Sequence, residues 1–312
     1  MTTKKISVVG AGHVGATCSQ LLSQKELAQE VILLDIVEGI PQGKGLDQWE
    51  SAPIEGFDSR VIGANSYDEA ENSEVFIVTA GIARKPGMSR DDLLKTNAGV
   101  ISSVSREIKR VAPNAIVIVV TNPLDVMAQV ALEETGFPRE RVIGMAGVLD
   151  TARYRSFIAL ELDVSIEDIQ ALVLGGHGDT MVPLASYTSV SGIPLTQLLS
   201  QDRIDALIER TRKGGGEIVS HLKTGSAYYA PAAAAVQMAE AIVKNKRRIL
   251  PCAAWLQGEY GMRDLYLGVP CMLGENGIER VIEVELDAKE RTALESSAEH
   301  VRSTVAALKS LD

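Results

Sequence analysis

The segment Gly175-Gly176-His177-Gly178-Asp179 combines the residue types that proton transfer needs. Histidine is the side chain whose ordinary pKa lies nearest neutrality, so His177 can both give and accept a proton. The flanking glycines let the backbone adopt conformations that other residues avoid, and they leave space for a ligand beside the ring. The apolar run 169–174 predicts a strand that ends just before the histidine. Taken alone, the pattern also fits an ordinary turn, and polar residues elsewhere in the chain have to distinguish the two interpretations.

A glycine-rich motif near the N-terminus has the spacing of a dinucleotide-binding turn. Gly10, Gly12 and Gly15 form GxGxxG between an apolar run at 6–9 and a helical run at 16–22. In this motif the first glycine makes the tight turn, the second lets the backbone approach a pyrophosphate, and the third lets the helix pack on the strand. The helix N-terminus adds N–H groups and a partial positive charge. Glycine-rich turns are common, so the motif alone is weak evidence.

A carboxylate stands where the same motif needs one. The apolar run 31–34 predicts a second buried strand, and it ends in Asp35, about twenty residues after the last glycine. There the carboxylate can accept hydrogen bonds from ribose hydroxyls, and it would repel a 2′-phosphate. No arginine follows it directly. We therefore predict NAD rather than NADP as the cofactor, with a solvated carboxylate at a strand end as the alternative.

Three cations gather in one loop of an otherwise acidic chain. Pro86-Gly87 marks the segment 81–92 as a loop, and this segment carries Arg84, Lys85 and Arg90. A long loop at the ligand edge of a doubly wound sheet is a natural mobile lid. The alternative is a solvated basic loop, which is the usual fate of surface cations.

Further polar groups come from other segments. Asn122 ends an apolar strand and can hydrogen-bond a small polar ligand. Asp150 and Arg153 are three residues apart at the start of a predicted helix, so they lie on one face and could reach a common pocket. An internal ion pair between them is the alternative. Together with the arginines of the loop, these groups favour His177 as an acid/base residue beside a small anion.

Strands alternate with helices along the first half of the chain. Each strand is almost wholly apolar, which predicts a Rossmann-type doubly wound α/β fold with a parallel sheet covered on both faces. Ligands of such sheets bind at the carboxyl ends of the strands, so Gly10, Asp35, 80–81 and 121–122 should lie along one edge. The predicted strands are 6–9, 31–34, 61–63, 75–79, 115–120 and 141–144, and the predicted helices are 16–22, 43–51, 100–111 and 124–134.

After Asp150 this rhythm breaks, which predicts an α+β domain for substrate binding and catalysis. We expect an NAD-binding domain of residues 1–145 and a catalytic domain of residues 146–312, packed as one body. Three glycines at 214–216 should interrupt a long helix, and close packing, a bend or a hinge under the lid would explain them. Pro231 should kink the next helix or delay its start. The expected pieces are an antiparallel segment at 181–189, a turn at 192–194, helices at 202–222, 224–244 and 288–311, and strands at 250–256 and 266–273.

Composition narrows the class of partner. The chain has 312 residues and a net charge of −10, which argues against nucleic acid and anionic membranes as partners. Cys18, Cys252 and Cys271 are odd in number and far apart, which fits a reducing cytoplasm better than a disulfide framework or a metal site. No signal-peptide pattern opens the chain, and no apolar run is long enough to cross a bilayer. We expect a cytoplasmic protein without a metal.

Six motifs spread over the chain carry a specific resemblance. They are GAGHVG with Asp35, GIARKPGMSR, VTNPLD, GVLDTAR, GGHGD and KTGSAYYAPAAA. With these the chain resembles the lactate/malate dehydrogenase superfamily, and within it the malate dehydrogenases of the lactate dehydrogenase-like branch. The similarity runs from the first strand to the final helix. It implies the reversible oxidation of (S)-malate to oxaloacetate with NAD, by enzymes that are dimers or tetramers built partly from the helix after 39–41.

The resemblance also implies a role for each site residue. His177 would be the proton donor and acceptor, oriented by Asp150, and Arg90 would move with the lid and polarise the reacting carbonyl. The substrate would be bound by Arg84, Arg90, Asn122, Arg153 and Ser226, with Arg153 on the 1-carboxylate. The cofactor would be contacted by Gly10, Ala11, Gly12, His13, Val14, Gly15, Asp35, Asn97, Val120, Thr121 and Asn122.

Arg84 separates the two substrate classes of this superfamily, because lactate enzymes resemble this chain but have a neutral glutamine near that position. An arginine can meet the second carboxylate of oxaloacetate with two charge-assisted hydrogen bonds, whereas pyruvate would leave it desolvated without a partner. Two alternatives stay open. One is an enzyme for lactate or another 2-hydroxy acid, and the other is a dinucleotide-binding protein without catalytic activity.

Overall fold

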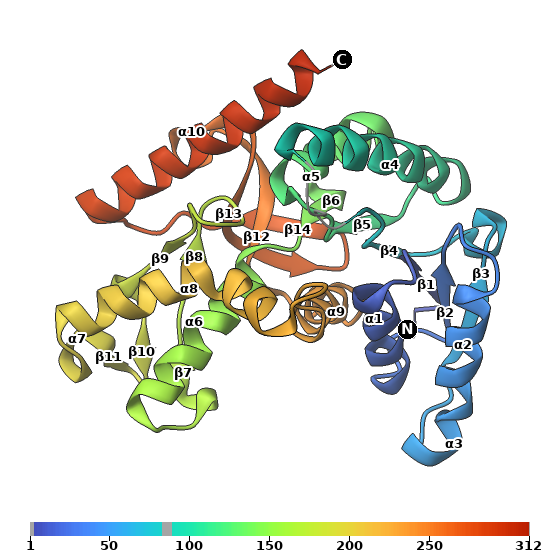
Figure 1. The fold of residues 1–312 in the computed structure, drawn as a ribbon, viewed down its shortest axis with the longest axis horizontal. Helices are drawn as coiled ribbons and strands as arrows, with labels where there is room; N and C mark the ends of the chain where they lie inside the picture. Colours follow the sequence, from blue (N-terminus) through green and yellow to red (C-terminus); the bar gives the residue numbers. More distant parts are fainter. Residues whose placement is uncertain (1–2, 83–88, 312) are drawn as a thin grey trace.

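The computed structural model describes residues 3–82 and 89–311, and it is built around one nine-stranded sheet (Figure 1). The strand order is β14-β13-β12-β6-β5-β4-β1-β2-β3. Neighbours from β6 to β3 are parallel, and the pairs from β14 to β6 are antiparallel. The strands are β1 (Lys5–Val9), β2 (Glu30–Leu34), β3 (Arg60–Ala64), β4 (Val75–Val78), β5 (Ile116–Val119), β6 (Val142–Gly144), β12 (Arg248–Gln257), β13 (Arg263–Gly274) and β14 (Gly277–Val281). The predicted doubly wound sheet is confirmed.

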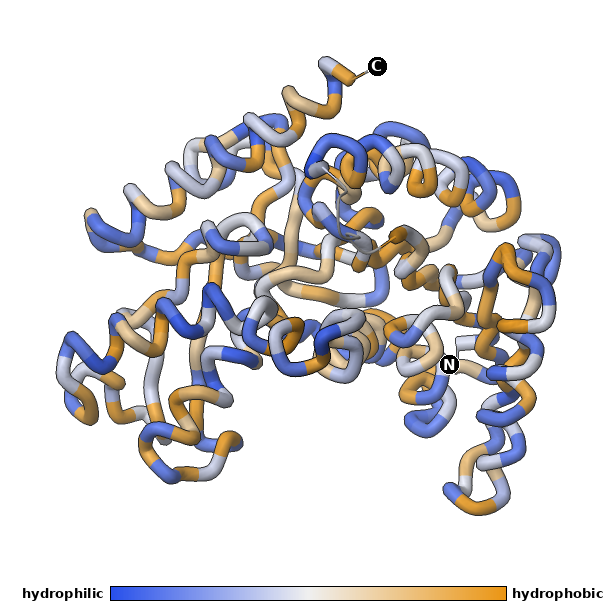
Figure 2. Tube along the Cα trace, viewed as in Figure 1, coloured by the Kyte–Doolittle hydropathy of each residue, from blue (hydrophilic) through white to orange (hydrophobic). Residues whose placement is uncertain are grey.

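The wholly apolar strands are explained by helices on both faces. Along β4, Val75 and Ile77 point into one hydrophobic core, and Phe76 and Val78 point into the other. α1 and α9 pack on the first face, and α4 and α5 on the second (Figure 1). Hydrophobic residues follow the central strands, and hydrophilic turns lie on the outside of the helices (Figure 2). The first-half helices are α1 (His13–Gln24), α2 (Ile40–Glu50), α3 (Ala52–Glu55), α4 (Arg90–Val111) and α5 (Leu124–Thr135).

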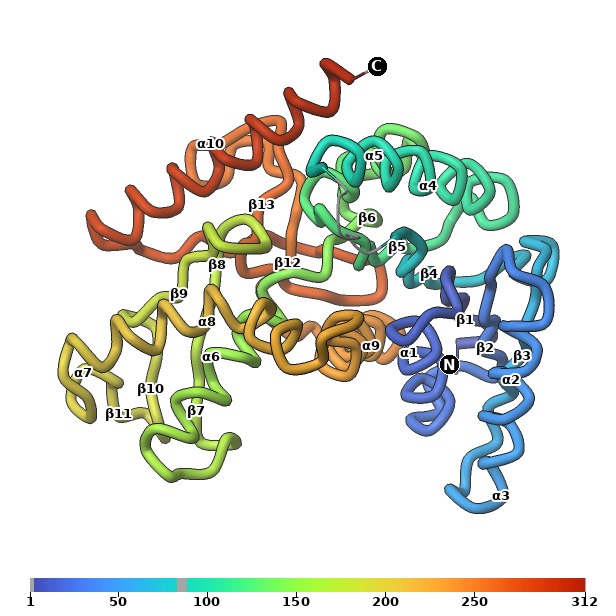
Figure 3. The backbone as a smooth tube through the Cα atoms, in the orientation of Figure 1, coloured from blue at the N-terminus to red at the C-terminus, as the bar shows by residue number. Residues whose placement is uncertain are grey.

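The second half adds helices, two small sheets and the three antiparallel strands of the large sheet. The small sheets have the orders β11-β10-β7 and β8-β9. The C-terminal helix α10 lies beside α4 and α5 (Figure 3). The remaining helices are α6 (Gly147–Leu162), α7 (Leu195–Leu198), α8 (Gln201–Leu222), α9 (Tyr229–Val243) and α10 (Ala288–Ser310). The short strands are β7 (Ile169–Gln170), β8 (Val173–Leu174), β9 (Val182–Pro183), β10 (Ser189–Val190) and β11 (Ile193–Pro194). Single turns of 3-10 helix lie at η1 (Tyr67–Ala70), η2 (Arg139–Arg141), η3 (Ile166–Asp168), η4 (Ala185–Tyr187) and η5 (Glu259–Gly261).

Local predictions for the second half are partly confirmed and partly wrong. α8 runs unbroken through 214–216, so the predicted interruption is wrong. A Cβ on Gly214 would lie 3.2 Å from Arg153 Cδ, which confirms close packing as the reason for this glycine. α9 begins at Tyr229 rather than at 224, which confirms the delayed start predicted from Pro231; this proline lies in the first turn, where the missing N–H is tolerated. The run 169–174 forms two short strands in different sheets, and the predicted turn at 192–194 contains the strand β11.

The two halves share the large sheet. β6, the last strand of the first half, pairs with β12 of the second through Gly144 and Ala253. One core cluster also contains residues of both halves. Residue 145 therefore divides the chain by sequence, but the two halves do not pack as separate units. Within the described ranges, no helix is both long and apolar enough to cross a membrane.

Candidate active site

The glycine motif folds into an open turn at the carboxyl end of β1. Gly10 has φ +102°, a conformation that side chains with a Cβ rarely adopt. A Cβ on Gly15 would lie 1.8 Å from the Gly10 carbonyl oxygen, so helix and turn touch there. At Gly12, by contrast, a Cβ built there would have no heavy atom of the described residues within 4 Å apart from those of its chain neighbours and of the glycine itself. α1 begins at the next residue without a side-chain cap, so its first N–H groups remain for an anionic ligand.

Asp35 is held rigidly beside this turn. Its Oδ2 accepts the Ala11 N–H at 2.7 Å, and its Oδ1 accepts the Val37 N–H at 3.0 Å. Lys44 Nζ donates to the Ala11 carbonyl at 2.6 Å. A carboxylate oxygen has more than one lone pair, so Asp35 can still accept from ribose hydroxyls. The open space at Gly12, the uncapped helix and this carboxylate together fit a dinucleotide.

The neighbouring strands end at the same edge, as expected. Thr121 Oγ1 donates to the Ala80 carbonyl at 2.7 Å. The Asn97 side chain is 1% exposed; its Nδ2 donates to the Asn122 carbonyl at 2.7 Å, and its Oδ1 accepts the Ile82 N–H at 2.9 Å. Asn97 thus links the segments that follow β4 and β5 through hydrogen bonds to both. Its contact with NAD stays a prediction.

The histidine loop places two carboxylates against His177. Its Nδ1 lies 2.9 Å from Asp150 Oδ2, and its backbone N–H donates to Asp125 Oδ2, also at 2.9 Å. Burial opposes protonation of the ring, but the charge and hydrogen bond of Asp150, with a contribution from Asp125, outweigh it and raise the pKa of His177. Asp179, close to the histidine in sequence, has an exposed side chain, whereas Asp150, the partner that the resemblance implied, makes the ring contact.

Arg153 extends the same row of charges. Its Nη1 lies 3.2 Å from Asp150 Oδ1, and its side chain is 14% exposed. Arg153 Nε is buried without a hydrogen-bond partner among the described residues. A Cβ on Gly215 would lie 3.7 Å from Arg153 Nη2, so the glycines of α8 leave space around the guanidinium. A partly satisfied buried guanidinium is suited to a carboxylate ligand.

These groups face a cavity of about 360 Å³ formed by both halves of the chain. Six predicted site residues line it, from the glycine motif, the end of β5, α6, the histidine loop and the segment before α9: Val14, Val120, Asn122, Arg153, His177 and Ser226. Residues that the sequence did not suggest also line it: Met145, Leu149, Met181, Arg212, Gly215, Gly216 and Val219. The glycine triplet beside Arg212 was the available signal, since three glycines within a helix indicate close approach of another group.

Two predicted arginines are not placed at the cavity. Arg90 is exposed in the first turn of α4, which is capped by Ser89 and Asp92, and it is not among the described residues that line the cavity. Arg84 lies outside the described residues. The roles of both arginines in substrate binding stay predictions.

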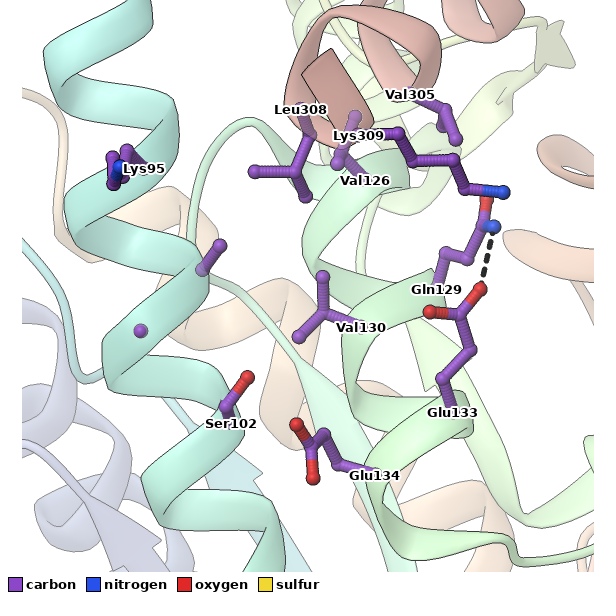
Figure 4. A pocket seen from close by; sticks show the side chains of 12 residues that line it. Lys95, Ser102, Val126, Gln129, Val130, Glu133, Glu134, Val305, Leu308 and Lys309 are labelled. Atoms are coloured by element: carbon purple, nitrogen blue, oxygen red, sulfur yellow. Dashed lines mark hydrogen bonds between the residues drawn. The ribbon is translucent and has the colours of Figure 1, made fainter. Parts of the chain in front are cut away.

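A second cavity, of about 320 Å³, lies between α4, α5 and α10 (Figure 4). Apolar side chains such as Val130 and Leu308 line it together with Gln129 and Glu133, which are hydrogen-bonded to each other at 2.8 Å. It contains none of the predicted site residues. In the part of the chain that is described, no group of three or more histidine, cysteine and acidic side chains is arranged to hold a metal ion.

Two family models match the chain. Residues 4–144 match "lactate/malate dehydrogenase, NAD binding domain", and residues 147–311 match "lactate/malate dehydrogenase, alpha/beta C-terminal domain". Among curated relatives, malate dehydrogenase of Chloroherpeton thalassium is 58% identical over 96% of both chains. Malate dehydrogenase of Roseiflexus sp. is 55% identical over 98% of this chain and 99% of its own.

Solved structures agree in fold. The malate dehydrogenase of Salinibacter ruber is 54% identical, covers 98% of both chains and superposes with a TM-score of 0.95. A lactate dehydrogenase from Cryptosporidium parvum, complexed with lactic acid and NAD, is 43% identical over 99% of both chains and also has a TM-score of 0.95. Fold therefore does not separate the two substrate classes. The chain belongs to the lactate/malate dehydrogenase family.

Proposed function

We propose that the protein catalyses the NAD-dependent, reversible oxidation of (S)-malate to oxaloacetate. The observation that carries this proposal is the row His177–Asp150–Arg153 at one cavity, with distances of 2.9 and 3.2 Å along it. The glycine turn reaches the same cavity through Val14. A base, a carboxylate anchor and a dinucleotide turn at one cavity are what hydride transfer from a hydroxy acid requires.

In malate oxidation, His177 accepts the proton of the substrate hydroxyl, and in the reverse direction it donates that proton to the carbonyl oxygen. NAD, when bound, supplies the acceptor for the C2 hydride. Asp150 fixes Nδ1 of the ring as the protonated nitrogen, which leaves Nε2 for the substrate, and it stabilises the imidazolium. Burial of the pair strengthens this interaction, because water does not screen it.

The arginines divide the remaining tasks. Arg153 holds the carboxylate next to the reacting carbon, Arg90 stabilises negative charge that develops on the carbonyl oxygen, and Arg84 pairs with the second carboxylate. Asn122 and Ser226, both at the cavity, supply hydrogen bonds to the substrate. In the first domain, which we assign to residues 1–145, the glycine turn, Asp35 and the ends of β4 and β5 hold the cofactor.

One spectrophotometric experiment tests this function against its alternatives. NADH loss is followed with oxaloacetate, with pyruvate and with no substrate; we expect rapid loss with oxaloacetate alone. Preference for pyruvate would support a lactate enzyme, and no loss with either substrate would support a non-catalytic binding protein. Arg84→Gln should move preference toward pyruvate, because a site built for a charged partner rejects an analogue lacking it by ~10⁴ or more. Undiminished oxaloacetate reduction in this variant would exclude Arg84 as the second anchor.

We further propose that the protein forms a homodimer or homotetramer. Large apolar side chains are exposed just after β2 and on the helices α2 and α3, where Ile36 is 95% exposed, Leu46 58% and Ile54 85%. Exposed apolar patches of this kind mark protein interfaces. A cytoplasmic location is consistent with three buried cysteines in the free thiol form.

A further inference from the structure

Asp125 is a buried carboxylate that the reaction described above does not use. It lies in the first turn of α5, three residues after Asn122, and is 6% exposed. Its Oδ2 accepts the backbone N–H of His177 at 2.9 Å. Its Oδ1 is buried and has no hydrogen-bond partner among the described residues. A carboxylate is rarely buried with one oxygen unpartnered, because desolvation disfavours the charge.

A small cavity of about 60 Å³ lies next to Asp125. Its lining includes Asp125, Thr180, His300 and Thr304, so three polar side chains surround the carboxylate. His177 lines both this cavity and the substrate cavity, and it therefore lies between them. Asp125 lines the small cavity and is not among the described residues that line the substrate cavity.

The charged groups around this contact come from three elements besides α5. His177 follows β8, Asp150 and Arg153 belong to α6, and His300 belongs to α10. Burial raises the pKa of Asp125 to about 6, although the hydrogen bond and charge of His177 lower it; the charge of Asp150 adds to the rise. Near neutral pH the carboxylate is therefore mainly ionised, and its charge favours the protonated ring of His177.

We propose that Asp125 is a positioning residue for the reaction: it fixes the backbone of His177 and supplies a second negative charge that stabilises the imidazolium. This rests on the proposed function only in taking His177 as the acid/base residue. Asp150 binds the ring, while Asp125 acts through the backbone and through space. The two carboxylates act from different helices, so removing either charge should leave the other contact in place.

The test replaces Asp125 by Asn, which keeps an acceptor for the His177 N–H and removes the charge. Glu133→Gln on the same helix is the matched control, because it makes the same charge change on a side chain that does not line the small cavity. The protein has four histidines, so imidazole NMR spectra can follow each ring, with His177→Asn assigning the signal. We expect the His177 titration midpoint to fall by about half a pH unit or more in Asp125→Asn and to stay unchanged in the control.

An unchanged midpoint in a folded Asp125→Asn protein would overturn the proposal. If that variant does not fold, Asp125→Ser takes its place, because a hydroxyl group can also accept the His177 N–H but carries no charge. An unchanged midpoint in folded Asp125→Ser would then overturn the proposal. These measurements need no substrate, so they are independent of the oxaloacetate assay. In kinetics, Asp125→Asn should lower kcat for oxaloacetate reduction about three- to tenfold at pH 8 with little change in KM, and should change malate oxidation less.

Discussion

The replacement Asp150→Asn tests the central pair of the site most directly. Asp150 is 2% exposed and touches both His177 and Arg153, and the variant keeps its size while removing its charge. A hydrogen bond between charged groups contributes about 1.5–3 kcal/mol. Loss of that amount from the protonated ring lowers oxaloacetate reduction near pH 8 by about 10- to 150-fold, since each 1.4 kcal/mol is a factor of ten.

The sign of the pH effect follows from the direction of the shift. The folded-state pKa of His177 is raised, so the ring keeps its proton to higher pH than a free histidine, and the variant loses that proton as pH rises through a lower range. Oxaloacetate reduction needs the protonated ring, so in the variant its rate should begin to decline at a lower pH than in wild type as the pH is raised. Malate oxidation above pH 9 should be less affected.

Stopped-flow measurement of NADH oxidation from pH 5 to 10 gives both the loss of rate near pH 8 and the shift of the pH profile. The control is Glu161→Gln, since Glu161 lies on the same helix and is also ion-paired, with Arg203 at the surface. We expect the control to stay within about twofold of wild type. If Asp150→Asn retained the wild-type rate and pH profile, the assignment of Asp150 as the partner of the catalytic histidine would be refuted.

Three further outcomes are expected. Gly15→Ala should prevent normal folding of the cofactor turn, because its Cβ would meet the Gly10 carbonyl. Gly12→Ala should fold with wild-type thermal stability and bind NADH more weakly. Equal thermal stability of the two variants would contradict the packing argument. Asp125→Asn should gain stability relative to wild type by about 2 kcal/mol between pH 4 and pH 7 in urea titrations, because the carboxyl pKa rises from 3.8 to about 6 on folding and most of the resulting penalty develops between these two values; a pH-independent difference would exclude this linkage. Ile54→Glu should reduce the mass measured by light scattering, and an unchanged oligomer would place the interface elsewhere.

The first half of the fold was predictable because its signals are local. Strands such as β4 are apolar on both faces, and the structure shows why: alternate residues enter two different cores. The glycine turn and Asp35 were equally visible, since each is defined by its own short segment. Parallel sheets align the ends of their strands, so these separate segments could be assigned to one edge before any contact was known.

The second half was less predictable because long-range packing determines it. Three glycines in a helix are compatible with a break, a bend or close packing, and only the contact of Gly214 with Arg153 of α6 shows that close packing applies here. Asp125 had been seen as part of a motif, but its contact with His177, 52 residues away, depends on how α5 meets the histidine loop. A local pattern contains no information about such a contact.

The seam between β6 and β12 limits how the enzyme can be re-engineered. A Cβ on Gly144 would lie 2.7 Å from that of Ala253, so the two strands meet with no room for a larger residue. A chimera that joined the first half of this chain to the second half of a relative would have to preserve both small residues across the junction. Grafting the loop 81–92 alone would leave the seam intact. Exchange of substrate preference between relatives should therefore succeed more readily by loop transfer than by recombination at residue 145.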